Sequence, residues 1–113
     1  MTCIFCQIIE GKAPGNILFG DEQVTAFQDA HPIAPVHILI VPNLHISTLN
    51  DMKTEFEGLV GHMVNVARQL AREYGVSTSG YRLVFNTGPD SGQSIFHLHL
   101  HMIGGRALPF HFR

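Results

Sequence analysis

The sequence HLHLHMIGG, residues 97–105, places a histidine at every second position with apolar residues between them. Side chains of a β-strand alternate between its two faces, so this spacing puts the three histidines on one face and Leu98, Leu100 and Met102 on the other. On a helix the same spacing would point the imidazoles to different sides. We therefore predict a strand over 96–103, with one face in the core and the other available for chemistry.

The remaining segments predict an α+β fold with an antiparallel sheet of about five strands, a usual size for one domain. Runs of branched and aromatic residues predict the other strands, and a turn at 20–23 joins the first two in a hairpin. The run at 36–41 has the composition of a central strand. A chain of 113 residues suits one core, so we expect one domain over 1–113. The expected strands are 17–19, 24–27, 36–41, 81–85 and 96–103.

Apolar residues at helical spacing predict two helices. The first is short and covers 4–10. The second is long, with Asn50 or Asp51 expected to cap its start and Gly75 to end it. His62 falls away from its apolar stripe and is expected to face solvent. The stripe, which we expect to pack on the sheet and on a second subunit, consists of Phe56, Leu59, Val60, Met63, Ala67, Leu70 and Tyr74.

The charge balance argues against a polyanionic partner. Seven Lys and Arg residues are scattered along the chain and the formal net charge is −2, so we expect binding neither to nucleic acid nor to a membrane. No apolar run approaches the roughly 20 residues that span a bilayer, and the first residues lack the pattern of a signal peptide. We expect a cytoplasmic protein with a small ligand.

The histidine face admits three interpretations. Its imidazoles could be partly exposed on a solvated sheet, as a single histidine usually is. They could bind metal, since alternating histidines on a strand can supply two ligands of a catalytic zinc site. They could also perform nucleophilic catalysis, in which one imidazole attacks an electrophile while its neighbours orient it and carry protons. His37 and His45, on or beside another strand, make the solvated interpretation the weakest.

The loop at 86–94 precedes the histidine strand and is rich in glycine and polar residues. Its glycines let the backbone approach a ligand, and backbone N–H groups with Gln93 and Ser94 can hold an anion such as phosphate. It contains neither a Walker loop nor a dinucleotide fingerprint. An anion site beside three imidazoles favours chemistry on a phosphate group.

Cys3 and Cys6 form a C-x-x-C pair, the spacing of two zinc thiolates. A structural zinc needs four ligands, so the pair alone does not specify one. Two unligated thiols in a reducing cytosol are the alternative. A redox pair is disfavoured, because no thioredoxin-like βαβ pattern surrounds it.

The sequence GQSIFHLHLHMIGGR, residues 92–106, resembles the signature of the histidine triad (HIT) superfamily. Its GQS and GGR flanks resemble the histidine triad nucleotide-binding (HINT) branch. The likeness extends over nearly the whole chain, including IFCQII (4–9), AFQDAHPIAPVHILIVPNLHI (26–46), the long helix and GYRLVFNTG (80–88). The resemblance implies a homodimeric HIT fold and hydrolysis or transfer at the α-phosphorus of a purine nucleotide.

The resemblance also implies a catalytic set. His99 would be the nucleophile, forming a covalent nucleotidyl-histidine that water then cleaves. His101 would contact the substrate and assist proton transfer to the leaving group. His97 occupies the first position of the triad, and His37 matches a fourth histidine that backs the triad through hydrogen bonds. Neutral imidazole, with a pKa of about 6.5, has a lone pair available near pH 7, so this chemistry needs no metal and no organic cofactor.

Further positions match nucleotide contacts of the family. Asp29 matches the acid that holds the ribose hydroxyls, and four apolar residues match the wall around the base, although their spacing by itself predicts only core. Ala30 stands where the family often has a larger aliphatic residue, which weakens the inference of a purine preference. The full expected nucleotide set is Ile4, Phe5, Ile8, Phe27, Asp29, Asn86, Gly92, Gln93, Ser94, His99 and His101.

In some bacterial HIT proteins a similar cysteine pair is completed by two histidines. Carried onto this chain, the resemblance implies a structural zinc held by Cys3, Cys6, His45 and His97. Such an ion would pin the N-terminal helix to the histidine strand, and His97 would then not carry protons. The C-terminal segment 109–113 is expected to contribute to the dimer.

We therefore expect a hydrolase that converts purine nucleoside phosphoramidates to nucleoside monophosphates through His99. Three alternatives remain open. The substrate could be a dinucleoside polyphosphate or another nucleotidyl anhydride. The protein could be a nucleotide- or zinc-binding regulatory module with little turnover. It could also be a metal-dependent hydrolase that uses the histidine face as ligands.

Overall fold

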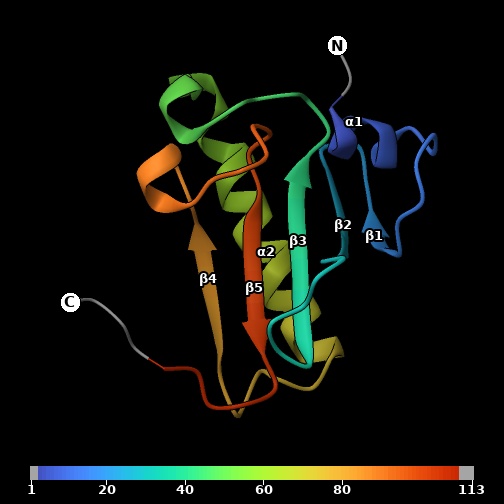
Figure 1. Cartoon of the computed structure of the whole chain (residues 1–113), viewed down its shortest axis with the longest axis vertical. Coiled ribbons are helices and arrows are strands. Elements are labelled where there is room, and N and C mark those ends of the chain that lie inside the picture. The colour runs from blue at the N-terminus through green and yellow to red at the C-terminus, as the bar shows by residue number, and fades with distance from the viewer. Residues whose placement is uncertain (1–2, 110–113) are drawn as a thin grey trace.

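The computed structural model of the chain describes residues 3–109. Its strands form one antiparallel sheet in the order β1-β2-β3-β5-β4, with the long helix α2 packed across one face (Figure 1). The predicted α+β fold is confirmed, as are the hairpin and the central strand. None of the helices in this part of the chain is long and apolar enough to cross a membrane. The elements are α1 (Ile4–Ile9), β1 (Ile17–Gly20), β2 (Val24–Gln28), β3 (Val36–Pro42), α2 (Glu57–Glu73), β4 (Tyr81–Phe85) and β5 (Leu100–Gly104).

β3 is buried on both faces of the sheet. Its side chains alternate between the two faces, so neighbouring residues enter different apolar clusters. Ile38 and Ile40 belong to the main core with residues of α2, whereas Leu39 and Val41 pack with Phe5 of α1 in a second cluster. The apolar residues between the histidines lie in the main core, as the alternation predicts. These are Leu98, Leu100 and Met102, none of them more than 1% exposed.

The long helix begins later than predicted. Asp51 belongs to a short 3-10 turn, Leu49–Asp51, in which the side chains of Thr48 and Asp51 cap each other's backbone. Asn50 donates its backbone N–H to Thr48 Oγ1 within the same turn. Met52 is then extended, with φ −68° and ψ 139°, and this interrupts the helical hydrogen bonds. The polar residues at 50–51 do belong to a capped turn, but that turn is a single 3-10 turn and not the start of the long helix. The helix α2 starts only after a second 3-10 turn, Thr54–Phe56.

His62 is partly exposed, with 30% of its side chain accessible, but its ring also pairs with a carboxylate, which the sequence did not predict. Its Nε2 lies 2.6 Å from Asp21 Oδ2, in the turn between β1 and β2. The other carboxylate oxygen of Asp21 accepts the backbone N–H groups of Gln23 and Val24 at 2.8 Å each. This contact ties α2 to the hairpin. Tyr74, the last residue of the predicted apolar stripe, lies beyond the end of α2 and is 43% exposed.

The regular strand β5 begins at Leu100, later than predicted. Residues 97–99 lead into it but lie beyond the pairing with β3. The backbone N–H of Leu98 instead donates to the carbonyl of Ile46, at 2.6 Å, in the loop that follows β3. The first two triad histidines are therefore held by loop backbone, and only His101 stands in the sheet ladder.

Candidate active site

A cavity of about 770 Å³ is lined by α1, the end of β2, the loop before β5 and the histidine face. This volume falls in the range of small-molecule sites. The expected nucleotide set, apart from Gln93, lines this cavity. The lining members of the set are Ile4, Phe5, Ile8, Phe27, Asp29, Asn86, Gly92, Ser94, His99 and His101.

Phe5 joins the apolar wall of the cavity to the histidines. Its ring lies 5.2 Å from the ring of Phe27 and 5.2 Å from the imidazole of His99, edge to face in both cases. Phe5 is only 4% exposed, so α1 packs its side chain firmly against the nucleophile candidate. Aromatic pairs at this distance and tilt attract one another and restrict ring rotation. The short helix thus limits where the His99 ring can turn.

One nitrogen of His99 is committed to the backbone. Nδ1 lies 2.7 Å from the main-chain carbonyl oxygen of His97, and a carbonyl can only accept, so Nδ1 carries the proton. In the neutral ring the lone pair then belongs to Nε2. His99 lines the cavity, and a free lone pair on its second nitrogen is what nucleophilic attack requires.

A second set of contacts, the imidazole chain, runs from Ile33 through His37 to His101. The backbone N–H of Ile33 donates to Nδ1 of His37 at 3.2 Å, which leaves the proton of neutral His37 on Nε2. That Nε2–H donates to Nδ1 of His101 at 2.9 Å. His101 therefore accepts at Nδ1 and carries its own proton on Nε2. Asp29 Oδ2 lies 3.3 Å from His37 Nε2, beside the chain.

The environment keeps this chain neutral. Burial, followed by the neighbouring imidazoles of His99 and His37, lowers the pKa of His101 to about 4. Burial also lowers the pKa of His37, against the opposing effect of the Asp29 carboxylate. At pH 7 each ring then carries one proton, which agrees with the donor and acceptor assignments above.

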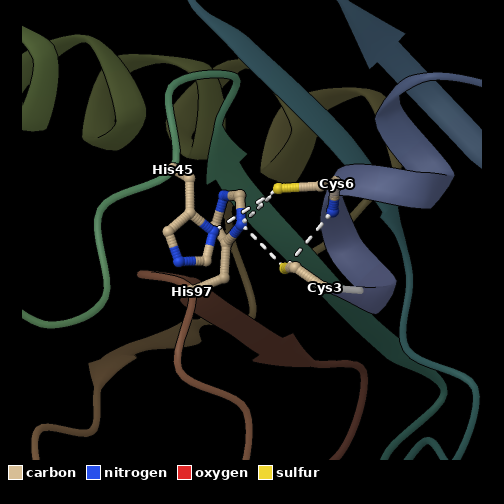
Figure 2. Close-up of side chains that lie close together, drawn as sticks. All are labelled: Cys3, Cys6, His45 and His97. Carbon is tan, nitrogen blue, oxygen red and sulfur yellow. Dashed lines mark hydrogen bonds between the residues drawn. The ribbon is translucent and has the colours of Figure 1, made fainter. Parts of the chain in front are cut away.

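Cys3, Cys6, His45 and His97 come together as the Cys–His cluster (Figure 2). The Sγ of Cys3 lies 3.3 Å from His97 Nδ1, and the Sγ of Cys6 lies 3.4 Å from His45 Nδ1 and 3.6 Å from His97 Nδ1. The cysteines come from the start of α1, His45 from the loop after β3, and His97 from the approach to β5. All the donor atoms lie within 4.8 Å of one another.

The donor set of the Cys–His cluster fits zinc. Tetrahedral coordination with ordinary zinc–ligand bond lengths puts sulfur and nitrogen about 3.6 Å apart, close to the separations found. The Nε2–H of His97 donates to the Pro42 carbonyl at 2.8 Å, so Nδ1, which faces the thiols, keeps its lone pair. Burial lowers the pKa of His97 and, together with the Cys3 thiol, raises the pKa of Cys6 to about 11. A divalent cation would reverse the shift at Cys6 by taking the thiolate as a ligand.

A second group of ligand-type atoms, from Asp29, His37 and His101, does not fit a metal. The nitrogen of His37 that faces the group is Nε2, and the Ile33 N–H on Nδ1 makes Nε2 the protonated nitrogen. A neutral imidazole cannot accept at one nitrogen and ligate with the other. Backbone contacts therefore distinguish the two groups: one presents lone pairs to a common point and the other forms a hydrogen-bond chain.

Gln93 lies inside the loop and not on the cavity surface. Its side chain is buried and donates to the carbonyls of Ser47 and Ile95, at 3.0 and 3.1 Å, while its oxygen accepts from Gly88 N–H at 2.9 Å. All of its amide hydrogen-bonding groups are thus engaged in shaping the loop. Ser94, the next residue, is the one that lines the cavity.

Sequence reasoning missed the backbone groups that orient His37 and His97. Ile33 N–H and the Pro42 carbonyl set which nitrogen of these two histidines carries the proton. Residue type does not reveal such roles, since every residue except proline offers the same two groups. The prolines around Ile33 marked a loop but not its contact with His37.

Comparison with known proteins decides the family. A family model described as "Scavenger mRNA decapping enzyme C-term binding" matches residues 2–109. A purine nucleoside phosphoramidase of Escherichia coli K12 is 46% identical over 105 residues, which cover 93% of this chain and 88% of that protein. The chain belongs to the histidine triad (HIT) superfamily.

Solved HIT structures match the fold closely. A HIT family hydrolase from Legionella pneumophila Philadelphia 1 has a TM-score of 0.94 at 41% identity, covering 96% of this chain and 97% of that one. A Zn-bound histidine triad family protein from Mycobacterium smegmatis has a TM-score of 0.81 at 33% identity, covering 94% of this chain and 76% of that one. The predicted HIT fold is confirmed, and the chain is a nucleotide hydrolase of the HIT type.

Proposed function

We propose that this HIT protein hydrolyses purine nucleoside phosphoramidates through a covalent nucleotidyl intermediate on His99. The observation that carries the proposal is the 2.7 Å contact from His99 Nδ1 to the His97 carbonyl, which directs a lone pair from Nε2 to the cavity. Support for the substrate comes from the E. coli relative, whose name gives a purine nucleoside phosphoramidase.

The cavity lining suggests how the substrate lies. The base packs against the apolar wall of Phe5 and Phe27, and the ribose hydroxyls donate to the carboxylate of Asp29. The α-phosphate then lies between His99 and the loop that carries Ser94 and Asn86. The wall, the carboxylate and the imidazoles all border one cavity, as this arrangement requires.

The reaction proceeds in two displacements. His99 Nε2 attacks phosphorus, and the amine leaves with the electron pair of the broken P–N bond and takes the Nε2 proton of His101, which also borders the cavity. Water then attacks the nucleotidyl-histidine and returns one proton to His101 Nε2. The monophosphate is released, and His99 recovers its lone pair. Dividing the reaction in this way avoids direct attack by weakly nucleophilic water.

The Cys–His cluster would hold a structural zinc ion. Zinc bound there contributes folding free energy by joining α1 to the approach of β5. The chain's own residues prepare the site, because Pro42 fixes the ring nitrogen that His97 offers. The Zn-bound M. smegmatis relative supports this part of the proposal.

The protein is further proposed to act as a homodimer that pairs through β4. β4 is an edge strand of the sheet (Figure 1), and all of its residues, Tyr81–Phe85, are only half-buried in the single chain. An uncovered edge strand of this kind is a template for pairing with a second strand. The C-terminal segment expected to join the dimer lies largely outside the described residues. Cytoplasmic location and the lack of nucleic-acid or membrane partners stay predictions from composition.

The experiment compares wild type with His99→Gly, both loaded with zinc, in release of amine from a purine nucleoside phosphoramidate. The variant should lose roughly 10⁴-fold or more in kcat, as expected for removal of a nucleophile. It should still bind the nucleoside monophosphate in a calorimetric titration, because the apolar wall and Asp29 are intact. Negligible turnover by both proteins would refute phosphoramidate hydrolysis, and anhydride substrates would then be tested.

A further inference from the structure

Ile33 lies in the loop between β2 and β3, and both of its backbone polar groups are engaged. Its N–H donates to His37 Nδ1 at 3.2 Å, and its carbonyl oxygen accepts from the Arg106 guanidinium at 2.9 Å. The side chain of Ile33 is 59% exposed, so apolar packing does little to hold this residue in place. Its backbone hydrogen bonds must therefore do so.

Arg106 reaches Ile33 at the end of the β3–β5 pair, where Val36 stands opposite Gly104. It lies two residues beyond β5, and a second guanidinium nitrogen donates to the carbonyl of Ala107 at 2.9 Å, which fixes the direction of the side chain. Gly105 brings the chain against the loop: a Cβ there would lie 2.9 Å from Pro35. Arg106 does not line the cavity, so it is not placed to touch a ligand there.

The contact with Ile33 acts together with the Asp29 carboxylate, 3.3 Å from His37 Nε2, to set the direction of the imidazole chain. With Ile33 N–H on Nδ1, His37 must donate from Nε2, and His101 must accept at Nδ1 and carry its proton on Nε2. Without the Ile33 donor, His37 can take its proton on Nδ1. The hydrogen bond between the rings would then reverse, and His101 would turn a lone pair toward the cavity in place of a proton.

We propose that Arg106 is a positioning residue: by holding the Ile33 carbonyl it keeps Ile33 N–H on His37, and so makes His101 present a proton to the ligand. This inference deepens the proposed function and rests on it, because it assigns the proton on His101 to the leaving group. A donor at that position matters most for a leaving group that departs as a strong base. It matters little for one that departs as a stable anion.

The kinetic test uses two substrates that differ only in the leaving group: a purine nucleoside phosphoramidate of an alkyl amine and the corresponding 4-nitrophenyl phosphodiester. Arg106→Gln should lower kcat on the phosphoramidate about 5-fold, the size of effect expected from losing one exposed, charge-assisted hydrogen bond. On the nitrophenyl ester the loss should stay under about 2-fold. Arg106→Lys keeps one donor for the Ile33 carbonyl and should recover most of the lost rate.

The structural test does not depend on turnover. Nitrogen-15 NMR of histidine-labelled protein distinguishes a protonated ring nitrogen from an unprotonated one. In wild type, His37 and His101 should both carry the proton on Nε2, and in Arg106→Gln both should shift toward Nδ1. Arg68→Gln removes an exposed arginine whose side chain, among residues 3–109, donates to Asn65 in its own helix and to no other residue, and it should change neither the spectra nor the rates.

Unchanged histidine signals in Arg106→Gln, or equal losses on the two substrates, would overturn the proposal. A failure of the proposed function is separate and recognisable, because His99→Gly would then hydrolyse the phosphoramidate at the wild-type rate. The NMR result would stand in that case and still report whether Arg106 sets the direction of the chain.

Discussion

The backbone carbonyl oxygen of His97 accepts a hydrogen bond from His99 Nδ1, 2.7 Å away, and so orients the His99 ring. The imidazole of His97 belongs to the Cys–His cluster, 3.3 Å from Cys3 Sγ. A metal bound by that imidazole would therefore steady the backbone group that orients the nucleophile. The Cys–His cluster uses the imidazole of His97, and the nucleophile candidate His99 uses the carbonyl oxygen of that residue. The effects on stability and on the reaction can therefore be tested separately.

Zinc is expected to act on stability first. Loading the protein with zinc should raise its free energy of unfolding by about 3–4 kcal/mol when the free ion is in large excess over its dissociation constant. Chemical denaturation with and without a chelator measures this difference. Cys6→Ser should remove most of the gain, because it takes away one of the two thiolates.

Zinc should affect turnover only by keeping the protein folded, and not by taking part in the reaction. At a temperature where the chelated protein remains folded, its kcat should stay close to that of the zinc-loaded protein, even though its free energy of unfolding is lower. Immediate loss of turnover on chelation, with circular dichroism showing an intact fold, would contradict the structural role and favour a catalytic ion.

Gln93→Ala should destabilise the protein. The substitution removes the Gln93 partner of the Gly88 N–H and of the Ser47 and Ile95 carbonyls, which costs about 1–3 kcal/mol of unfolding free energy. Ser94→Ala is the matched control, because Ser94 lines the cavity. It should change stability by less than about 0.5 kcal/mol and lower kcat/KM. The opposite pattern, stable Gln93→Ala with lost activity, would mean that Gln93 contacts the substrate directly.

The alternation at 97–105 predicted the faces of β5 correctly, because strand geometry is local and needs no distant partner. The start of α2 was wrong because Thr48 and Asp51 cap a 3-10 turn with the same side-chain contacts that begin an α-helix. The Cys–His cluster was predictable only through the family resemblance, which joins His45 and His97 to the cysteine pair, because the C-x-x-C spacing alone does not specify the two histidines. Ile33 and Arg106 were not, since their roles depend on backbone groups brought together only by the folded chain.

The contact between Asp21 and His62 predicts an acid-sensitive part of the stability. Burial raises the pKa of Asp21, but the N–H groups of Val24 and Gln23 and the His62 ring outweigh it and hold the pKa below its usual value. A depressed folded-state pKa contributes stability above the unfolded value of about 3.9, and this is lost as the pH falls through the folded value.

Wild type should thus be more stable than Asp21→Asn at about pH 6 by about 0.5–1 kcal/mol, the usual worth of a partly exposed pair. The difference should be smaller at about pH 3, because below the unfolded pKa of about 3.9 the unfolded chain binds a proton that the folded carboxylate takes up less readily. Urea denaturation at both pH values measures it, and Glu22→Gln, an exposed carboxylate in the same turn, serves as the control. A difference that persists unchanged in acid would show that it does not arise from the charge of Asp21.

The stereochemistry at phosphorus tests the covalent His99 mechanism most directly. The substrate is a purine nucleoside thiophosphoramidate of defined configuration at phosphorus, hydrolysed in oxygen-18 water. Each in-line displacement inverts the configuration, so attack by His99 followed by attack by water predicts net retention, and His99→Gly should give no reaction. Net inversion would mean that water attacks phosphorus directly, and it would contradict the nucleotidyl-histidine intermediate.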